Sequence, residues 1–142
     1  MTTAAPEHDA GIGAARFARA GLFLKGLAAQ DFVRLGEALT ADARLRALLP
    51  AGLREWSGAE AIAARFAGWF GDTEDLEVVE AAADDVGGRL HMHWRLRLRA
   101  ERLGAGSFTI EQQAYADTGE GGRIARLDLL CTGYLPAGGD DD

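Results

Sequence analysis

Little in this sequence would cross-link the chain or anchor it in a membrane. Its single cysteine, Cys131, cannot form an internal disulfide, which fits a reducing compartment. There is no run of about 18 apolar residues, so no segment is expected to span a bilayer. Residues 1–13 lack the basic start and apolar stretch of a signal peptide. These absences predict a cytoplasmic protein without a membrane partner.

Positive charge is also scarce. The chain carries 22 Asp and Glu against 15 Lys and Arg, a net charge of −7. This excess repels phosphate backbones, so nucleic-acid binding would require a segregated basic face. The one candidate is residues 89–99, RLHMHWRLRLR, but base stacking would also require aromatics among its cations. Trp94 has the opposite parity and only Tyr115 would share that face, so no nucleic-acid partner is expected.

The composition is that of one globular domain. The chain has 142 residues, of which 48% are hydrophobic and 26% charged. Both ends are small and polar, and the last residues, AGGDDD, repeat one charge after glycines. Disorder is therefore predicted for residues 1–13 and 137–142, with a single domain at 14–136.

The first half of the domain has helical patterns. Apolar and small residues recur at helical spacing between residues 17 and 28, and again after Asp31, which can cap a second helix. Ser57 and Glu60 have the spacing of a capping box, which predicts the start of a third helix there. Gly71 is placed to end that helix. Its apolar face comprises Ile62, Phe66, Trp69 and Phe70.

The second half has the period of β-strands. A short strand is predicted at 44–50, and from Leu76 onward strands are predicted at 76–83, 89–102, 107–117 and 123–134. Glycine-rich turns join the last four into an antiparallel run. Helices followed by a meander predict an α+β fold. In it, three N-terminal helices pack in the concave face of a strongly curved, mainly antiparallel sheet, a cystatin-like cone with an open mouth.

Strand parity predicts which side chains face the helices. The inward set comprises Leu90, Met92, Trp94, Leu96 and Leu98, then Phe108, Ile110, Gln112, Ala114 and Ala116, then Ala125, Leu127, Leu129 and Cys131. Gln112 is the polar exception, and a buried amide needs hydrogen-bond partners. It either satisfies backbone or water in the core or orients a polar group of a ligand.

The histidines and arginines of 89–99 fall on the outer face. Cross-strand ion pairs with Asp and Glu are the simplest role for the arginines. Three roles are open for His91 and His93. They lie on a solvated strand face, they form a pH-dependent dimer contact, or they are two ligands of a metal site with Glu80 or Glu111 as the third. Two histidines without a further cluster do not predict a metal site, and no cofactor is expected. A bulge before His93 would turn a histidine inward and supply a base.

Several local features occur in the order seen in one family of cones. They are the helix break at Ala29-Gln30-Asp31, the short strand after it, the segment 56–62 and the Gly122-Arg123-Ile124 start of the last strand. Across residues 14–136 the chain resembles the nuclear-transport-factor-2-like superfamily. This superfamily includes SnoaL-type polyketide cyclases, ketosteroid isomerases and scytalone dehydratase. The resemblance implies an apolar small molecule held between sheet and helices, and a homodimer formed through the outer sheet face.

The catalytic residues of these relatives do not carry over. The tyrosine and two aspartates of ketosteroid isomerases fall on Phe23, Ala47 and Ala114, which are all apolar. That reaction needs a base and two acidic donors, so this chain is not expected to be such an isomerase. The resemblance also implies a test for limonene-epoxide-hydrolase relatives, which activate water with an arginine and paired aspartates. Here the residue two positions after Arg95 is Arg97 and not a carboxylate, so this arrangement is missing. His93 and Gln112 are left as weak catalytic candidates.

The resulting hypothesis is a pocket protein that acts on or binds a hydrophobic small molecule inside the cone, as SnoaL-like cyclases and isomerases do. Isomerase, cyclase, dehydratase and hydrolase activities are all compatible with it. The alternatives are a non-catalytic ligand-binding module and a dimeric accessory or scaffold protein. The predicted pocket residues are Phe23, Trp69, Met92, Trp94, Gln112, Ala114, Leu127, Leu129 and Cys131.

Overall fold

Three helices precede most of the sheet. The computed structural model describes the backbone of residues 4–137 and the side chains of residues 15–137. The helices are α1 (Ala4–Ala29), α2 (Phe32–Glu37) and α3 (Ala59–Phe70). α1 begins at Ala4 rather than near residue 14, and the predictions for residues 1–3 and 138–142 lie outside the described residues. None of the helices in this part of the chain is long and apolar enough to cross a bilayer.

The turn between α1 and α2 brings the two helices very close together. Asp31 caps α2 as predicted, because its side chain accepts a hydrogen bond from the Arg34 backbone N–H at 3.2 Å. At Gly26 a Cβ atom would lie 2.8 Å from the backbone nitrogen of Leu35. Only glycine permits this approach of α1 to α2.

The predicted capping box at the start of α3 is wrong. Ser57 is the last residue of a strand, β2 (Gly52–Ser57), and it pairs with Arg44 on β1 (Leu39–Leu49). The helix cap is Gly58, at a φ of 97°, and it makes no side-chain capping bond. Because strand pairing holds Ser57 in an extended conformation, the helix begins after Gly58. Gly71 ends α3 as expected.

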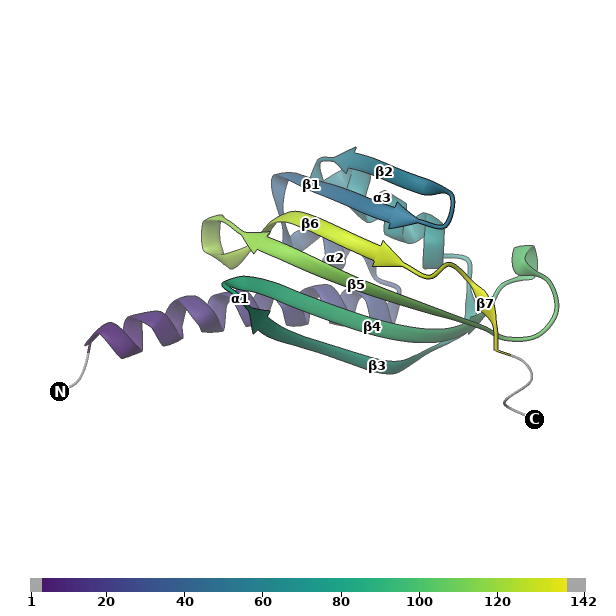
Figure 1. Cartoon of the computed structure of the whole chain (residues 1–142), viewed down its shortest axis with the longest axis horizontal. Helices are drawn as coiled ribbons and strands as arrows, with labels where there is room; N and C mark the ends of the chain where they lie inside the picture. Colours follow the sequence, from purple (N-terminus) through teal and green to yellow (C-terminus); the bar gives the residue numbers. More distant parts are fainter. Residues whose placement is uncertain (1–3, 138–142) are drawn as a thin grey trace.

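The sheet has seven strands. After β1 and β2 come β3 (Glu74–Val86), β4 (Arg89–Arg99), β5 (Phe108–Thr118), β6 (Ile124–Cys131) and β7 (Leu135–Pro136). Their order is β2-β1-β6-β5-β4-β3, with β7 paired to β5, and every pair is antiparallel except β1 with β6. All three helices lie on one face of the curled sheet (Figure 1). The predicted α+β class and mainly antiparallel sheet are therefore confirmed.

Several strand boundaries differ from the prediction. β1 begins at Leu39, and β2 and β7 were not predicted. β4 stops at Arg99, before a 3₁₀ turn at Glu101–Leu103; a second such turn, Glu120–Gly122, links β5 to β6. β6 ends at Cys131, because Gly133, at a φ of 80°, turns the chain toward β7.

The predicted alternation of the long strands is confirmed. The even-numbered residues of β4 from Leu90 to Leu98 are at most 1% exposed. β4 keeps one unbroken register with β5, whereas the irregularity near Val78 lies in β3. No bulge therefore turns His93 inward. On β6 a register shift buries Ile124 fully and leaves Ala125 half-buried, contrary to the predicted parity.

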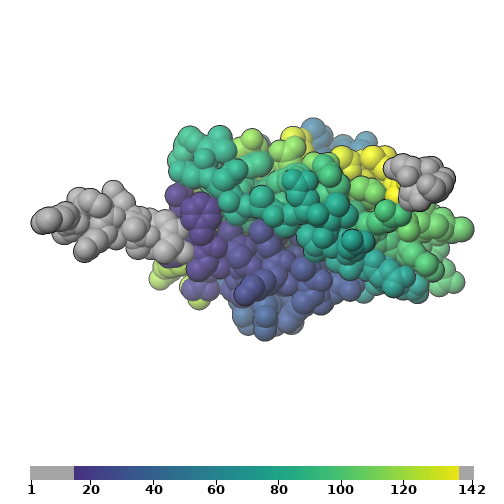
Figure 2. Space-filling model, turned by 90° about the horizontal axis from the view of Figure 1, so that it is seen from below, coloured from purple at the N-terminus to yellow at the C-terminus, as the bar shows by residue number. Residues whose placement is uncertain are grey.

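The helices close the inner face of the sheet. Figure 2, viewed from below, shows α1 in purple to blue lying along the teal surface of β3, which it contacts. α3 packs against β1 and β2 at the opposite edge (Figure 1). The core lies between these helices and the inner side chains of β4, β5 and β6.

Candidate functional site

A row of three side chains crosses the inner face of the sheet. The register places Trp94 of β4 opposite Gln112 of β5, and Gln112 opposite Cys131 of β6. The Trp94 indole N–H donates to the Gln112 amide oxygen at 2.8 Å, and the Gln112 amide nitrogen donates to Cys131 Sγ at 3.2 Å. The fully buried amide of Gln112 is therefore held by neighbouring side chains, not by backbone.

Aromatic side chains fill the space in front of this row. The Phe23 ring lies 5.3 Å from that of Phe66 and 5.6 Å from that of Trp94. A side chain beside a cavity wide enough for water keeps some accessible surface. Phe23, Phe66 and Trp94 keep none, so the interior beside them is closed and packed in this conformation.

The predicted pocket residues lie together along this packed interior. Phe23, Met92, Trp94, Gln112, Ala114 and Leu127 are fully buried, and Leu129 is 3% exposed. Trp69 and Cys131 are half-buried and lie between this interior and the surface. Ala47, like Phe23 and Ala114, has no exposed surface, so the three positions aligned with the ketosteroid-isomerase residues are buried and apolar.

A rim cluster, formed by Trp56, Arg65 and Trp69, adjoins the interior. The Trp69 ring lies 5.0 Å from Phe66 and 6.0 Å from Trp56. The guanidinium carbon of Arg65 lies 5.7 Å from each of the two indole rings. Trp69 thus connects the packed interior to a half-buried aromatic and cationic surface.

Arg102 fastens the end of α3 to the C-terminal part of the chain. Its guanidinium donates to Asp72 at 2.7 Å, to the Trp69 carbonyl at 2.9 Å and to the Tyr134 hydroxyl at 3.2 Å. The Tyr134 hydroxyl also donates to the Trp69 carbonyl. We call these four residues the Arg102 latch. Sequence reasoning missed Arg102, because the residue was assigned to the end of a strand.

The latch shifts the pKa of two groups in opposite directions. The hydrogen bond from Arg102 holds the pKa of Asp72 below its ordinary value. Burial raises the pKa of Tyr134, against the opposing effect of the Arg102 hydrogen bond. At neutral pH the latch therefore contains an ionised carboxylate, a guanidinium and a neutral phenol.

His93, the weak catalytic candidate, lies on the outer face. Its Nε2 atom is 2.7 Å from a carboxylate oxygen of Glu111, and this hydrogen bond lowers the pKa of Glu111. His91 similarly lies 3.1 Å from Asp84, and its ring is tilted by 38° against that of Tyr115, with the ring centroids 4.8 Å apart. Because successive residues of a strand face opposite sides, His93 is separated from the inner row by the sheet itself.

The arginines of the outer face are paired across strands as predicted. Arg89 binds Asp117 at 2.8 Å and Asp128 at 3.0 Å, and Arg95 lies 3.4 Å from Glu111 and 3.5 Å from Glu80. Among residues 15–137, no group of three or more His, Cys, Asp or Glu side chains is placed to hold a metal ion.

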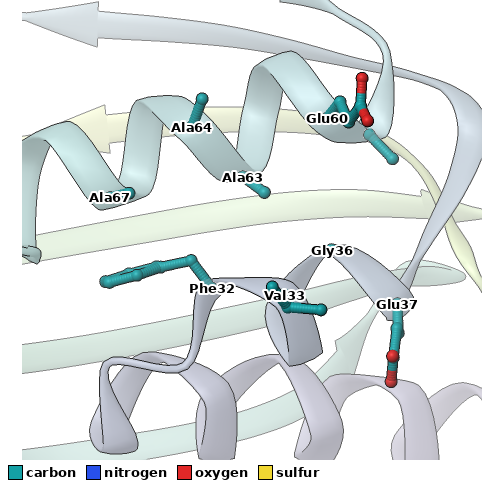
Figure 3. Close-up of a pocket in the computed structure, with 9 residues that line it drawn as sticks. Phe32, Val33, Gly36, Glu37, Glu60, Ala63, Ala64 and Ala67 are labelled. Atoms are coloured by element: carbon teal, nitrogen blue, oxygen red, sulfur yellow. The ribbon is translucent and has the colours of Figure 1, made fainter.

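The helical side of the molecule carries a groove that the sequence did not predict. It lies between α2 and α3 and has a volume of about 440 Å³. Figure 3 shows Phe32 and Val33 of α2 on one side, Ala63 and Ala67 of α3 on the other, and two carboxylates at one end. These carboxylates belong to Glu37 and Glu60. The groove is therefore apolar along its length and acidic at one end.

Comparison with known proteins identifies the architecture. No protein-family model and no curated protein sequence matches the chain. Among solved structures, a putative isomerase from Bacillus subtilis has a TM-score of 0.69 at 11% identity, over 85% of this chain and 88% of that one. A putative SnoaL-like polyketide cyclase from Shewanella putrefaciens has a TM-score of 0.64 at 13% identity, over 82% and 88%. A steroid delta-isomerase from Pseudomonas aeruginosa has a TM-score of 0.60 at 18% identity, over 83% and 80%.

The chain has the SnoaL-like, nuclear-transport-factor-2-like fold. At identities of 11% to 18% the likeness establishes this fold alone. In this fold the row of Trp94, Gln112 and Cys131 lines the interior of the cone, and Trp69 lies at the edge of that interior.

Proposed function

We propose that this SnoaL-like protein binds a hydrophobic small molecule inside the cone, against Trp94 and Gln112. The observation that carries the proposal is the buried amide of Gln112, the polar group on an otherwise apolar inner face. Among the described residues, the buried polar ones are Thr73 and Gln112, and Thr73 lies at the end of α3.

The Gln112 amide has hydrogen-bonding capacity left over. A primary amide offers two N–H donors and two acceptor lone pairs. Here one lone pair accepts from Trp94, and one N–H is directed at Cys131 sulfur, which is a weak acceptor. Buried polar capacity without a partner is unfavourable, so a ligand oxygen at this point would be stabilised. The amide favours a ligand with a carbonyl or hydroxyl group.

The apolar surroundings favour a ligand with a ring system. Phe23, Phe66 and Trp94 present aromatic surface on the helix side of Gln112. A steroid or a polyketide, the classes named for two of the similar structures, combines such rings with carbonyl oxygens. We therefore expect an oxygen-bearing polycyclic ligand.

Entry of this ligand requires the rim to move. The interior is closed, and Trp69 lies between it and the surface. The Arg102 latch holds the Trp69 carbonyl, and so holds the end of α3 in place. We infer that opening of the latch frees Trp69 to swing out and admits the ligand.

Binding is favoured over proton-transfer catalysis by the inner face itself. Such chemistry needs a base within hydrogen-bond reach of the substrate. Among the fully buried side chains of the described residues, none is a carboxylate or an imidazole. The ionisable member of the row is Cys131, which is half-buried.

Ligand titration tests the proposal. Binding of a steroid ketone, an anthraquinone and the hydrocarbon anthracene is measured by tryptophan fluorescence for the parent, Gln112→Met and Gln113→Met proteins. Gln113 is the matched control, because it is the next residue along β5 and faces outward. We expect Gln112→Met to weaken binding of the oxygenated compounds about tenfold, because one hydrogen bond is lost, and to leave anthracene binding unchanged.

Two results would contradict the proposal. One is the absence of binding of any compound to the folded parent protein, with folding checked by circular dichroism. The other is equal affinity for the ketone in the Gln112→Met and Gln113→Met variants, since the amide would then have no role.

A second candidate function is a dimeric accessory protein that associates through the outer sheet face. Leu48, Leu53 and Leu130 are about half exposed, at 49%, 54% and 51%, and they are neighbours across β1, β2 and β6. A hollow of about 510 Å³ adjoins Leu48 and Leu130. An apolar patch of this kind favours association with a second copy.

Sedimentation velocity between pH 5 and 8 tests this second function. We expect a dimer for the parent protein and a monomer for Leu48→Lys, because a charge would be buried at the contact. Val33→Lys, on the exposed helical side, is the control and is expected to stay dimeric. A monomeric parent protein throughout this pH range would refute the dimer.

A further inference from the structure

The parallel pairing of β1 with β6 places arginines side by side on the outer face. Arg44 of β1 is directly opposite Arg126 of β6, and Arg46 lies one outward position further along β1. Together with Glu55 of β2 they line a hollow of about 210 Å³. Like charges directly opposite each other on neighbouring strands destabilise a sheet, so this arrangement calls for a compensating charge.

The neighbouring carboxylates compensate for it only in part. Glu55 lies 3.8 Å from Arg44, a long distance for an ion pair. Asp128 is shared between Arg46 at 3.3 Å and Arg89 at 3.0 Å. On the other side of Arg126, its partner across β5 and β6 is Asp117.

Asp117 does not neutralise Arg126. Its carboxylate binds Arg89, at 2.8 Å. Arg126 makes no hydrogen bond or ion pair with any side chain in the part of the chain whose side chains are described. Three guanidinium groups and one carboxylate therefore line the hollow, and Asp128, just outside it, is shared between Arg46 and Arg89. The lining is positively charged, in a chain whose net charge is −7.

We propose that this hollow binds a dianionic oxyanion, either free phosphate or the phosphate group of a monoester. Guanidinium groups present N–H donors in a planar fork that matches the oxygens of phosphate, often in pairs. An oxyanion bound between Arg44 and Arg126 offsets the repulsion between their guanidinium groups. This site is on the opposite face of the sheet from Gln112, so it is independent of the ligand-binding function proposed above.

The exposure of the arginines predicts how the site behaves. The Arg44 and Arg46 side chains are 68% and 49% exposed, so solvent and salt screen their charges. Binding should accordingly be weak, fast in exchange and strongly salt-dependent. It should also raise the free energy of unfolding, and this increase should grow with the logarithm of the phosphate concentration once that concentration exceeds the Kd.

An NMR titration of the whole chain tests the site. Inorganic phosphate, phenyl phosphate and sodium chloride are added at matched ionic strength, and backbone amide shifts are followed in the parent, Arg126→Gln, Arg44→Gln and Arg34→Gln proteins. Arg34 is the matched control, because it is an exposed arginine of α2 that lies outside the hollow. We expect phosphate, and not chloride, to shift the amides of residues 44–46, 55 and 126–128.

The variants separate this site from general charge effects. Arg126→Gln and Arg44→Gln are each expected to weaken phosphate binding about tenfold, and Arg34→Gln to leave it unchanged. Tighter binding of phenyl phosphate than of inorganic phosphate would identify a monoester as the ligand, and the reverse order would identify the free ion. Equal shifts with chloride, or equal phosphate affinity in the Arg126→Gln and Arg34→Gln proteins, would overturn the proposal.

Discussion

Replacement of Arg102 by glutamine should loosen the end of the cone measurably. The guanidinium donates three hydrogen bonds, at 2.7, 2.9 and 3.2 Å, and lies 5.2 Å from the Tyr134 ring centroid. A hydrogen bond from a charged donor contributes about 1.5–3 kcal/mol when it is well shielded. The Arg102 side chain is 40% exposed, so screening reduces the sum. We expect a loss of about 2 kcal/mol in the free energy of unfolding.

Urea unfolding at pH 7 measures this loss. The control is Arg99→Gln, which removes an arginine that is 56% exposed and 3.7 Å from Asp75. It should change the free energy of unfolding by no more than about 0.5 kcal/mol. Hydrogen exchange of the backbone amides in residues 70–73 should also accelerate in the Arg102 variant and not in the control.

The pH dependence of this loss follows from Asp72. Its pKa is lowered in the folded state by the Arg102 hydrogen bond. The stabilisation is therefore complete above the unfolded pKa, about 4, and disappears as the pH falls through the lowered value. The difference between the parent and Arg102→Gln should narrow on going from pH 6 to acid. If Arg102→Gln and Arg99→Gln lower the free energy of unfolding by the same amount at pH 7, the Arg102 latch does not stabilise the fold.

Three further changes follow from the same packing. Burial raises the pKa of Tyr134, so the neutral phenol stabilises the folded protein below the unfolded pKa of about 10, and this stabilisation is lost as the pH rises through the folded value. Between pH 8 and 11, chemical denaturation should therefore show a smaller fall in the free energy of unfolding for Tyr134→Phe than for the parent protein. Phe66→Ala should lower the free energy of unfolding by about 3–5 kcal/mol and admit a small apolar dye, whereas a variant that excludes the dye would mean that the interior collapses. Gly26→Ala should destabilise the protein by about 1–3 kcal/mol, because its Cβ would clash with the backbone of Leu35. Gly21→Ala, in the same helix, is the control: its Cβ meets no atom within 4 Å, so it should stabilise the protein by up to about 1 kcal/mol. Equal changes in the thermal unfolding temperature of the two variants would contradict this prediction.

The parts of the fold that depend on local pattern could be predicted. The alternation of β4 and β5 assigned Met92, Trp94 and Gln112 to the inner face correctly, because a half-buried strand has a period of two. The start of α2 followed from Asp31, whose side chain caps the first turn.

Pairings between distant segments could not be predicted in the same way. β2 is short and mostly exposed, so the apolar pattern that marks a strand is weak there. Its pairing with β1 is also what displaced the expected helix start from Ser57 to Gly58. The parallel contact of Arg44 with Arg126 joins strands separated by most of the chain, and no local pattern indicates it.

The candidate site was partly visible in the sequence. Gln112 was identified as a polar residue of inward parity, and its partners Trp94 and Cys131 follow from the strand register. That the interior is closed depends on how Phe23 and Phe66 meet in space. The Arg102 latch depends on a turn that brings the residue back to α3, which spacing along the chain does not reveal.

The position of β6 has a consequence for how the chain folds. β1 pairs with β2, and β3, β4 and β5 pair in succession, so two partial sheets form from local hairpins. Within the described part of the sheet, β6 is the strand that joins them, and it follows all five of these strands in the sequence. Until it emerges from the ribosome, β1 and β5 each have an open edge. Because such long-range closure is slow, docking of β6 should be the rate-limiting step of folding, and a nascent chain that stalls before Ile124 should be the species most in need of a chaperone.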